Sequence, residues 1–185
     1  MFENNHIKVV QFKTSPEAEA TGAIMAAWLN HQLADETRDR LAAHGITEID
    51  YEQYYPFQTF LDVMREIAES ENNTTMQLVS VGKAAAMSIE MDDFPDMAAF
   101  EGFISVLHGL NVRNMPEYEG WFSEWHDGNL YVLNNTPVSN DLVFGFLWEL
   151  LNHVKIGDGY YTPIPHEHYP SNERGSIFHI EPRED

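Results

Sequence analysis

The chain contains no cysteine among its 185 residues. Disulfide bonds, thiolate metal sites and cysteine nucleophiles are therefore excluded. No apolar run is long enough to span a bilayer, and the first residues, MFENNHIKVV, lack the basic-then-apolar pattern of a signal peptide. These absences favour a soluble, cytoplasmic protein.

Basic residues are scarce, with 10 Lys and Arg against 30 Asp and Glu and a formal net charge of −20. Nucleic acids and anionic membranes attract proteins of the opposite sign. Both are therefore excluded as principal partners. The acidic excess has two interpretations: a soluble surface, or an acidic face for a basic partner or cation.

The stretch from Trp121 to His153 predicts a β-hairpin followed directly by a helix. Apolar and polar residues alternate on both sides of Asp127-Gly128, a dipeptide typical of tight hairpin turns. After the second strand, Ser139 and its neighbours offer helix N-cap oxygens. A broad apolar face at helical spacing follows, which predicts a buried final helix.

The rest of the chain predicts mostly helices. We expect a short strand over 7–12, a helix or helix pair over 16–44 that starts at Ser15-Pro16, and a connector over 46–55. Further helices are expected from Pro56, after Thr74, and from Pro95 to near Gly109. Two short edge strands are expected at 160–161 and 177–180.

The predicted fold class is therefore α+β: a helical bundle followed by a small antiparallel sheet with a terminal hairpin. A chain of this length is expected to form a single domain over residues 1–185. Its core is expected over 16–154, with a C-terminal extension over 155–185 that is rich in turn-forming residues.

Three segments together resemble a known superfamily. In chain order, they are YYP at 54–56 opening a helix, LVSVGK at 78–83, and NTPV at 135–138 followed by Asp141 and Gly145. This pattern resembles bacterial relatives of the heme–nitric-oxide-binding (H-NOX-like), 4-vinyl-reductase and transport-particle-subunit superfamily. The resemblance covers about residues 46–154. It implies a pocket for a small molecule between the helices and the sheet.

The chain departs from that superfamily in two ways. The cysteine that members often carry after the proline is absent, and Ser139 or Asn140 stands there. The Tyr-x-Ser-x-Arg clamp with which the gas-sensing members hold heme propionates is also absent. The resemblance therefore implies the fold and a pocket but not heme.

His166 and His168 have the clearest metal-ligand spacing. Residues two apart on an extended chain face the same side, so both imidazoles could reach one Zn²⁺ or similar ion. His179 or an acid would complete such a site. The alternative is a solvated loop, which the flanking prolines favour.

His108, near the end of a predicted helix, has two interpretations. As an axial heme ligand it would face an apolar cavity walled by residues such as Phe103, Leu107 and Trp121. As a structural residue it would interact with the helix dipole and cap carbonyls. Heme and a divalent metal are thus the two cofactors considered.

Five further residues are candidates for ligand binding. Arg113 could bind a ligand carboxylate, or pair with nearby acids such as Glu117 and Glu119, which we favour. The others are aromatic, and core packing is their alternative role: Trp121, Trp125, Tyr131 and Trp148. Neutral aromatic walls suit a binding protein better than a hydrolase.

The sequence thus favours a non-enzymatic sensor or ligand-binding domain, with a small hydrophobic or aromatic ligand and a homodimeric assembly. Two alternatives from other classes stay open. One is a metal-dependent enzyme built on His166 and His168. The other is an acidic adaptor that docks a basic protein.

Overall fold

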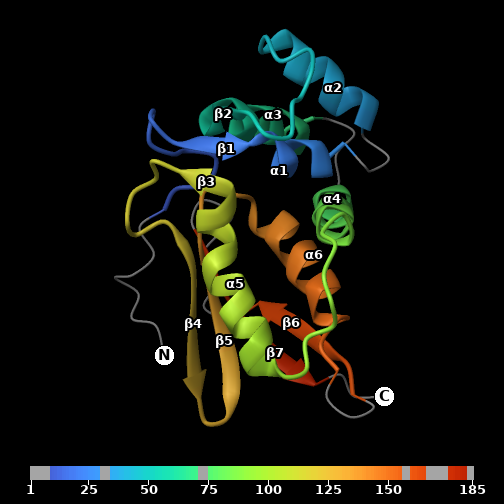
Figure 1. Cartoon of the computed structure of the whole chain (residues 1–185), viewed down its shortest axis with the longest axis vertical. Helices are drawn as coiled ribbons and strands as arrows, with labels where there is room; N and C mark the ends of the chain where they lie inside the picture. The colour runs from blue at the N-terminus through green and yellow to red at the C-terminus, as the bar shows by residue number, and fades with distance from the viewer. Residues whose placement is uncertain (1–8, 30–33, 71–74, 156–158, 166–174, 183–185) are drawn as a thin grey trace.

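The computed structural model describes residues 9–29, 34–70, 75–155, 159–165 and 175–182. Its elements follow one another as β1–α1–α2–β2–α3–α4–α5–β3–β4–β5–α6–β6–β7. They form a helix-dominated α+β arrangement with two antiparallel sheets, which confirms the predicted fold class (Figure 1). Within the described segments, no helix has both the length and the hydropathy needed to cross a bilayer.

A small three-stranded sheet, which the sequence did not predict, has the order β2-β1-β3. Its strands are β1 (Glu19–Thr21), β2 (Tyr54–Pro56) and β3 (Val112–Arg113). Ala20 pairs with Tyr55 on one side and with Val112 on the other. The connector predicted over 46–55 thus ends in a strand that we did not expect, whereas the predicted helix start at Pro56 is confirmed, because Pro56 is the N-cap residue of α3 (Phe57–Ala68). Pro56 also ends an edge strand, where its missing N–H breaks no ladder.

The predicted helix over 16–44 is a pair of helices that begins later than expected. These are α1 (Gly22–Ala27) and α2 (Ala34–Ala43). The N-cap of α1 is Thr21, whose hydroxyl accepts the N–H of Ile24 at 3.5 Å. Ser15 does not cap a helix; its hydroxyl donates to the Glu17 carboxylate. Strand pairing of residues 19–21 overrides the local helix signal at Pro16.

The strand predicted over 7–12 was wrong in its described part. Residues 11 and 12 lie in a turn, and Phe12 has a φ of 60°. Its N–H donates to the carbonyl of Pro137 at 2.7 Å, while the N–H of Val9 donates to the Asn135 side chain. These bonds hold the segment against the start of the final helix.

The other predicted helices are confirmed: α3 (Phe57–Ala68), α4 (Thr75–Met87), α5 (Met97–Asn111) and α6 (Asn140–Leu151). The Asp96 carboxylate caps α5 by accepting the N–H of Ala99 at 2.8 Å. This helix runs two residues past Gly109, where we expected it to end. Ser139 is the N-cap residue of α6 but makes no side-chain capping bond.

The hairpin is confirmed as β4 (Gly120–His126) and β5 (Asn129–Asn135). Asp127 and Gly128 both have positive φ, as a two-residue turn requires. The other strands are β6 (Tyr161–Pro165) and β7 (Ser176–Pro182), and the sheet order is β4-β5-β7-β6.

The prediction of β7 as an edge strand was wrong. It lies between β5 and β6 because its alternate residues Phe178 and Ile180 are buried and pack inward. The residues after 155 thus complete the main sheet. The other predicted edge strand, β6, does lie at an edge.

A buried polar network joins the end of β5 to α6. Asn134 donates to the Asn140 side chain at 3.0 Å and accepts the hydroxyl of Thr136 at 2.7 Å. Ser176 of β7 donates to the same Asn140 oxygen at 2.6 Å. Because these groups are almost fully buried, the network fixes where α6 leaves the sheet.

Helices α4 and α6 cross at two glycines. A Cβ on Gly82 would overlap the carbonyl oxygen of Leu142, and a Cβ on Gly145 would overlap that of Val79. The backbones are therefore in direct contact, and neither position has room for a side chain. Figure 1 shows α4 and α6 side by side, behind and beside α5.

We expect Gly82→Ala to destabilise the fold by about 1–3 kcal/mol or more, because the added methyl group must push two helix backbones apart. Denaturant unfolding followed by circular dichroism measures this. Gly102→Ala is the matched control, since a Cβ there meets only open space on α5. The control should gain about 0.5–1 kcal/mol from the better helix former. Equal stability of the two variants would contradict the close crossing.

Candidate functional site

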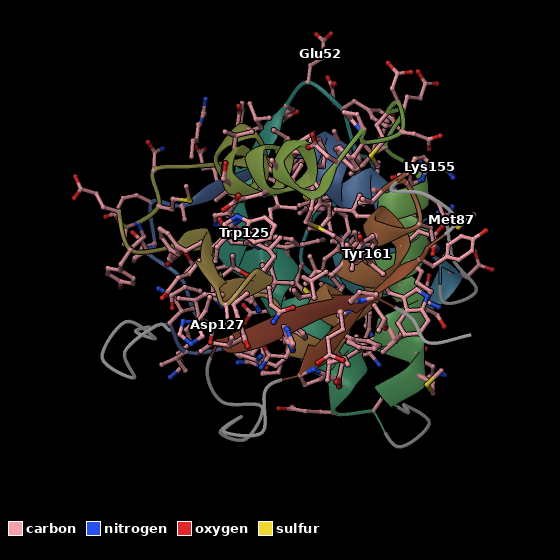
Figure 2. The ribbon with its side chains drawn as sticks, turned by 90° about the horizontal axis from the view of Figure 1, so that it is seen from below. Glu52, Met87, Trp125, Asp127, Lys155 and Tyr161 are labelled. Carbon is pink, nitrogen blue, oxygen red and sulfur yellow. The ribbon has the colours of Figure 1, made fainter. Side chains whose placement is uncertain are left out.

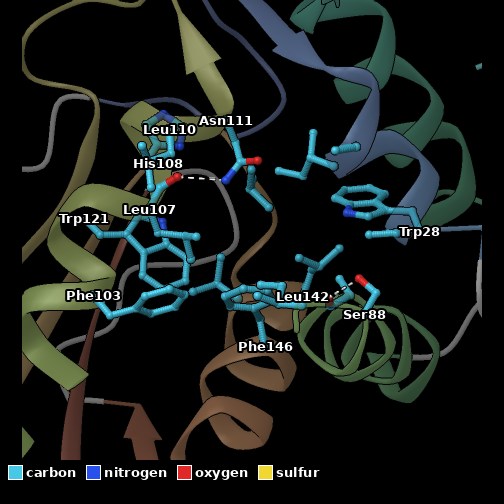
Figure 3. Close-up of a pocket in the computed structure, with 17 residues that line it drawn as sticks. Trp28, Ser88, Phe103, Leu107, His108, Leu110, Asn111, Trp121, Leu142 and Phe146 are labelled. Atoms are coloured by element: carbon cyan, nitrogen blue, oxygen red, sulfur yellow. Dashed lines mark hydrogen bonds between the residues drawn. The ribbon is translucent and has the colours of Figure 1, made fainter. Parts of the chain in front are cut away.

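A cavity of about 440 Å³ lies between α5 and strand β4 on one side and α1, α4 and α6 on the other. Figure 3 shows its walls, with Phe103, Leu107 and Trp121 facing Phe146 and Leu142, and Trp28 entering from α1. Its mouth includes the exposed residues Ala23, Ser88 and Leu110. The full lining is Ala23, Ile24, Ala27, Trp28, Ala85, Ser88, Ile89, Phe103, Leu107, His108, Leu110, Asn111, Trp121, Val138, Leu142, Val143 and Phe146.

The helical and strand periodicities place these side chains. Phe103 and Leu107 are four residues apart on α5 and therefore share its inner face. Trp121 stands on the inward face of β4, edge-on to Phe146 of α6, with ring centroids 5.6 Å apart and an interplanar angle of 88°. Such edge-to-face pairs are favourable for aromatic rings. Aromatic side chains that pack on one another thus form part of the cavity wall.

No Lys, Arg, Asp or Glu belongs to the described lining. Two of its polar side chains are already engaged. The Ser88 hydroxyl donates to the Ala85 carbonyl at 2.7 Å, and Asn111 donates to the Leu107 carbonyl at 2.9 Å. The oxygen of Asn111 accepts the Thr21 hydroxyl at 3.4 Å. The cavity therefore has a neutral interior.

His108 lines the cavity but is only 8 % exposed. Its ring centroid lies 6.3 Å from that of Phe57, in the core. Its Nε2 has almost no accessible surface and no hydrogen-bond partner among the described residues. Burial lowers the pKa of His108 from about 6.5 to about 4. The imidazole is therefore neutral at pH 7, so it does not serve the helix dipole as a cation.

Two of the other predicted ligand-binding residues lie away from the cavity in ion pairs or hydrogen bonds. Arg113 pairs with Glu19 at 2.7 Å, with its guanidinium 3.7 Å from the Tyr54 ring centroid. This agrees with the structural interpretation, although the acidic partner differs from those expected. Trp125 is 46 % exposed and donates to Glu101 of α5 at 2.6 Å (Figure 2).

Tyr131 and Trp148 also lie outside the described lining. The ring of Tyr131 stacks on His179 of β7, with centroids 4.6 Å apart and an interplanar angle of 8°. Trp148 contacts Phe144 and lies under the Lys83 ammonium, 4.9 Å from its ring centroid. Of the six predicted residues, the structure brings only His108 and Trp121 together at the cavity.

His166 and His168 lie outside the described residues. His179, the expected third ligand, is described: its Nδ1 lies 2.7 Å from Glu181, and its Nε2 is buried without a partner. Within the described ranges, no group of three or more His, Asp or Glu side chains could hold a metal ion.

One sequence motif with catalytic precedent is inactive here. Ser80 and Lys83 have the Ser-x-x-Lys spacing of some serine acyltransferases. The Ser80 hydroxyl donates to the Met76 carbonyl at 2.8 Å, and the Lys83 ammonium lies over Trp148. Among the described residues, the Ser80 hydroxyl therefore has its own helix as partner, and the Lys83 ammonium lies on an aromatic ring.

A second buried titratable group, Glu119, lies outside the described cavity lining. It is 5 % exposed and accepts the Thr14 hydroxyl at 3.2 Å. Burial raises the pKa of Glu119 to about 7, and the bond from Thr14 opposes this. The group ties the loop before β4 to the N-terminal segment.

Sequence reasoning missed the residues of α1 and α6 that complete the cavity. Trp28 carried only a helical core signal, and Leu142 and Phe146 belonged to a generic apolar face. No local pattern distinguishes a residue that lines a cavity from one that packs in a core. Only the placement of α1 opposite α5 makes Trp28 a lining residue.

No protein-family model matches the chain, and no curated protein matches its sequence. Solved structures do resemble it. The Fe(II) unliganded H-NOX protein from K. algicida has a TM-score of 0.57 at 13 % identity, and a point mutant of that protein has 0.61 at 15 %. Each match covers 89 % of this chain and 97 % of the other.

The chain has an H-NOX-like fold. The resemblance that the three sequence segments carried is therefore confirmed at the level of the fold. At such low identity the likeness extends to the backbone arrangement alone. The ligand that the cavity of this H-NOX-like fold could hold depends on the side chains that line it.

We expect His108 to make the protein less stable as the pH falls from about 6.5 to 4. The unfolded chain binds a proton at His108 first, because the folded state lowers the pKa of that group. A pKa lowered to about 4 corresponds to a loss of roughly 3 kcal/mol at the acidic end.

The measurement compares the free energy of unfolding of the wild type and His108→Leu at several pH values. The variant should lose less stability over this range. Glu119 changes the stability in the opposite direction, because its raised pKa stabilises the folded state as the pH falls. Glu119 is therefore kept in both proteins, so that its contribution is the same in each. Parallel pH profiles for the two proteins would contradict the buried, neutral His108.

Proposed function

We propose that this chain is a non-enzymatic small-molecule-binding or sensory domain, and that its ligand occupies the cavity between α5 and the α1–α4–α6 wall. The observation that carries the proposal is the cavity itself: about 440 Å³, open at one side, with no charged side chain in the described lining. Cavities of roughly 300–1,000 Å³ with mostly apolar walls are typical of small-molecule sites.

The chemistry of the lining supports binding rather than catalysis. A hydrolase needs a nucleophile beside a base, and a general acid or base needs a titratable group at the reacting atoms. His108 is the only titratable lining residue described, and its Nε2 is sealed against the core. The serine of the lining, Ser88, donates to its own helix.

The residues present do not fit heme, the group that the H-NOX-like fold implies. An axial histidine must offer a ring nitrogen to the iron, whereas the Nε2 of His108 has almost no accessible surface. The two propionates are negatively charged and would also need cations beside them. The described lining has no Lys or Arg, and Arg113 is paired with Glu19. We therefore assign no role to heme.

We expect purified protein to bind the neutral apolar dye Nile red. Ala85→Leu should weaken this binding about 5-fold or more, because the larger side chain occupies part of the cavity and reduces the area over which the dye can contact its walls. Ala85 lines the cavity and is 4 % exposed. Fluorescence titration gives the dissociation constants. Ala98→Leu is the matched control, an exposed alanine of α5 outside the described lining.

Two results would contradict the proposal. One is equal dye binding by the wild type, Ala85→Leu and Ala98→Leu. The other is a Soret band in the visible spectrum of the purified protein, which would restore heme as the ligand. Native mass spectrometry of the same sample reports any bound mass and the oligomeric state. The homodimer, the cytoplasmic location and the acidic adaptor role stay predictions.

A second candidate, a metal-dependent function, has one specific observation in its favour. His179 is oriented by Glu181 through Nδ1, the arrangement that metal-binding histidines commonly show. In the sheet, His179 pairs with Ile164, two residues before His166 in the chain. We propose that a metal, if bound, would use His179 with His166 and His168.

This candidate predicts about one Zn²⁺ or Fe²⁺ per chain by elemental analysis, lost in both His166→Ala and His179→Ala. His126→Ala is the control, because His126 contacts only Asp127 among charged partners and lies at the hairpin turn. A metal content near zero in the wild type would reject the metal-dependent alternative and leave the cavity proposal in place.

A further inference from the structure

The tryptophans of the described chain differ in what their indole N–H groups contact. Trp125, outside the cavity, donates to Glu101 at 2.6 Å. Trp28 and Trp121, which both line the cavity, donate to no described residue. A buried indole N–H usually has an acceptor, because burial removes its bond to water.

Trp28 is the stronger case because it is only 3 % exposed. In Figure 3 its ring extends from the end of α1 into the cavity, with the nitrogen on the side that faces the empty space. The described polar atoms that lack both a partner and accessible surface are the Nε2 atoms of His108 and His179. The Trp28 nitrogen is not among them, so it borders accessible space.

Other donors and acceptors of the wall do not compete for this position. Ser88 and Asn111 are both engaged with backbone carbonyls. The Nε2 of His108 has almost no accessible surface, so it does not border the open space of the cavity. The indole N–H of Trp28 is therefore a buried donor without a described partner that faces the open part of the cavity.

The charge of the chain narrows the ligand further. With a net charge of −20 and no basic residue in the described lining, an anion would lose its hydration without gaining a counter-ion. A cation would find no carboxylate there either. Both ionised classes are disfavoured by the same desolvation cost.

We infer that the cavity selects an uncharged, largely aromatic or aliphatic molecule that carries a hydrogen-bond acceptor, such as a ketone or ether oxygen, which accepts from the indole N–H of Trp28. This inference rests on the proposed function and names the class of ligand. The acceptor satisfies the buried donor, and the hydrocarbon part replaces water against Phe103, Phe146 and Trp121.

The test uses three probes of nearly the same shape: 2-acetylnaphthalene, 2-isopropenylnaphthalene and 2-naphthoate. The first offers a carbonyl acceptor, the second replaces that oxygen with a methylene group, and the third is an anion. Equilibrium dialysis gives the affinity of each for the wild type, Trp28→Phe and Trp125→Phe. Thermal unfolding of each variant checks that it is folded.

We expect Trp28→Phe to lower the ratio of ketone to alkene affinity by roughly 3- to 10-fold, as the loss of one uncharged hydrogen bond predicts. Trp125→Phe, which loses a bond outside the cavity, should leave that ratio unchanged. Naphthoate should bind the wild type at least about 10-fold more weakly than the ketone. If Trp28→Phe does not fold, the indole N–H resonance of Trp28 in the wild type is followed by NMR instead; it should shift more with the ketone than with the alkene, and equal shifts would overturn the inference.

An unchanged ratio in the folded indole variant would overturn the acceptor inference while the cavity remained a binding site. Naphthoate binding as tight as ketone binding would overturn the exclusion of anions. Absence of binding by all three probes would instead count against the proposed function, so the two failures are distinguishable.

Discussion

The direct backbone contact between α4 and α6 is the constraint on which the rest of the structure depends. Gly82 and Gly145 remove both side chains at the crossing, so each helix lies against a carbonyl of the other. Ala85, three residues after Gly82 on α4, and Phe146, directly after Gly145 on α6, both line the cavity. A wider crossing would shift both residues. The same contact therefore sets the shape of one cavity wall.

The opposite wall is held by a different kind of interaction. Glu101 of α5 accepts the hydroxyl of Ser123 and the indole N–H of Trp125, both at 2.6 Å. Ser123 and Trp125 lie two and four residues after Trp121 on β4, so all three side chains are on the same face of the strand. The carboxylate thus fixes α5 on the hairpin, and the space between the two walls stays open because α5 is tied to the sheet rather than to α4 or α6.

The parts of this fold that could be predicted are those with strong local signals. Asp127-Gly128 predicted the hairpin turn, and the apolar stripes of α3 and α6 predicted helices. The small sheet could not be predicted, because β1 and β3 are two or three residues long and exist only through pairing with distant partners. For the same reason Pro16 misled: a good helix start gives way when Ala20 pairs on both sides.

The residues of the candidate site likewise fall into those that the sequence predicted and those that only tertiary packing brings to the cavity. Trp121 and His108 were predicted because they belong to the segments that form the sheet-side wall. Trp28 was not, since only the tertiary packing of α1 opposite α5 brings it to the cavity. Arg113 and Trp125 were candidates for ligand binding because of their residue types, with an ion pair and core packing as their alternative roles, and each has a carboxylate partner in the structure. Residue type indicates chemistry, and only geometry shows whether that chemistry is available.

The H-NOX-like backbone implies heme, whereas the side chains of the described lining do not fit it. The side chains therefore carry the inference about the ligand. A fold fixes where a cavity forms, whereas the side chains around it fix what it holds. Here the Nε2 of His108 is buried near Phe57, and the described lining contains no Lys or Arg that could neutralise an acid group. What remains in the described lining is apolar surface, much of it aromatic, and the buried indole N–H of Trp28. The neutral ligand that we propose would meet both features, because its apolar part would contact that surface and its oxygen would accept from the indole N–H of Trp28.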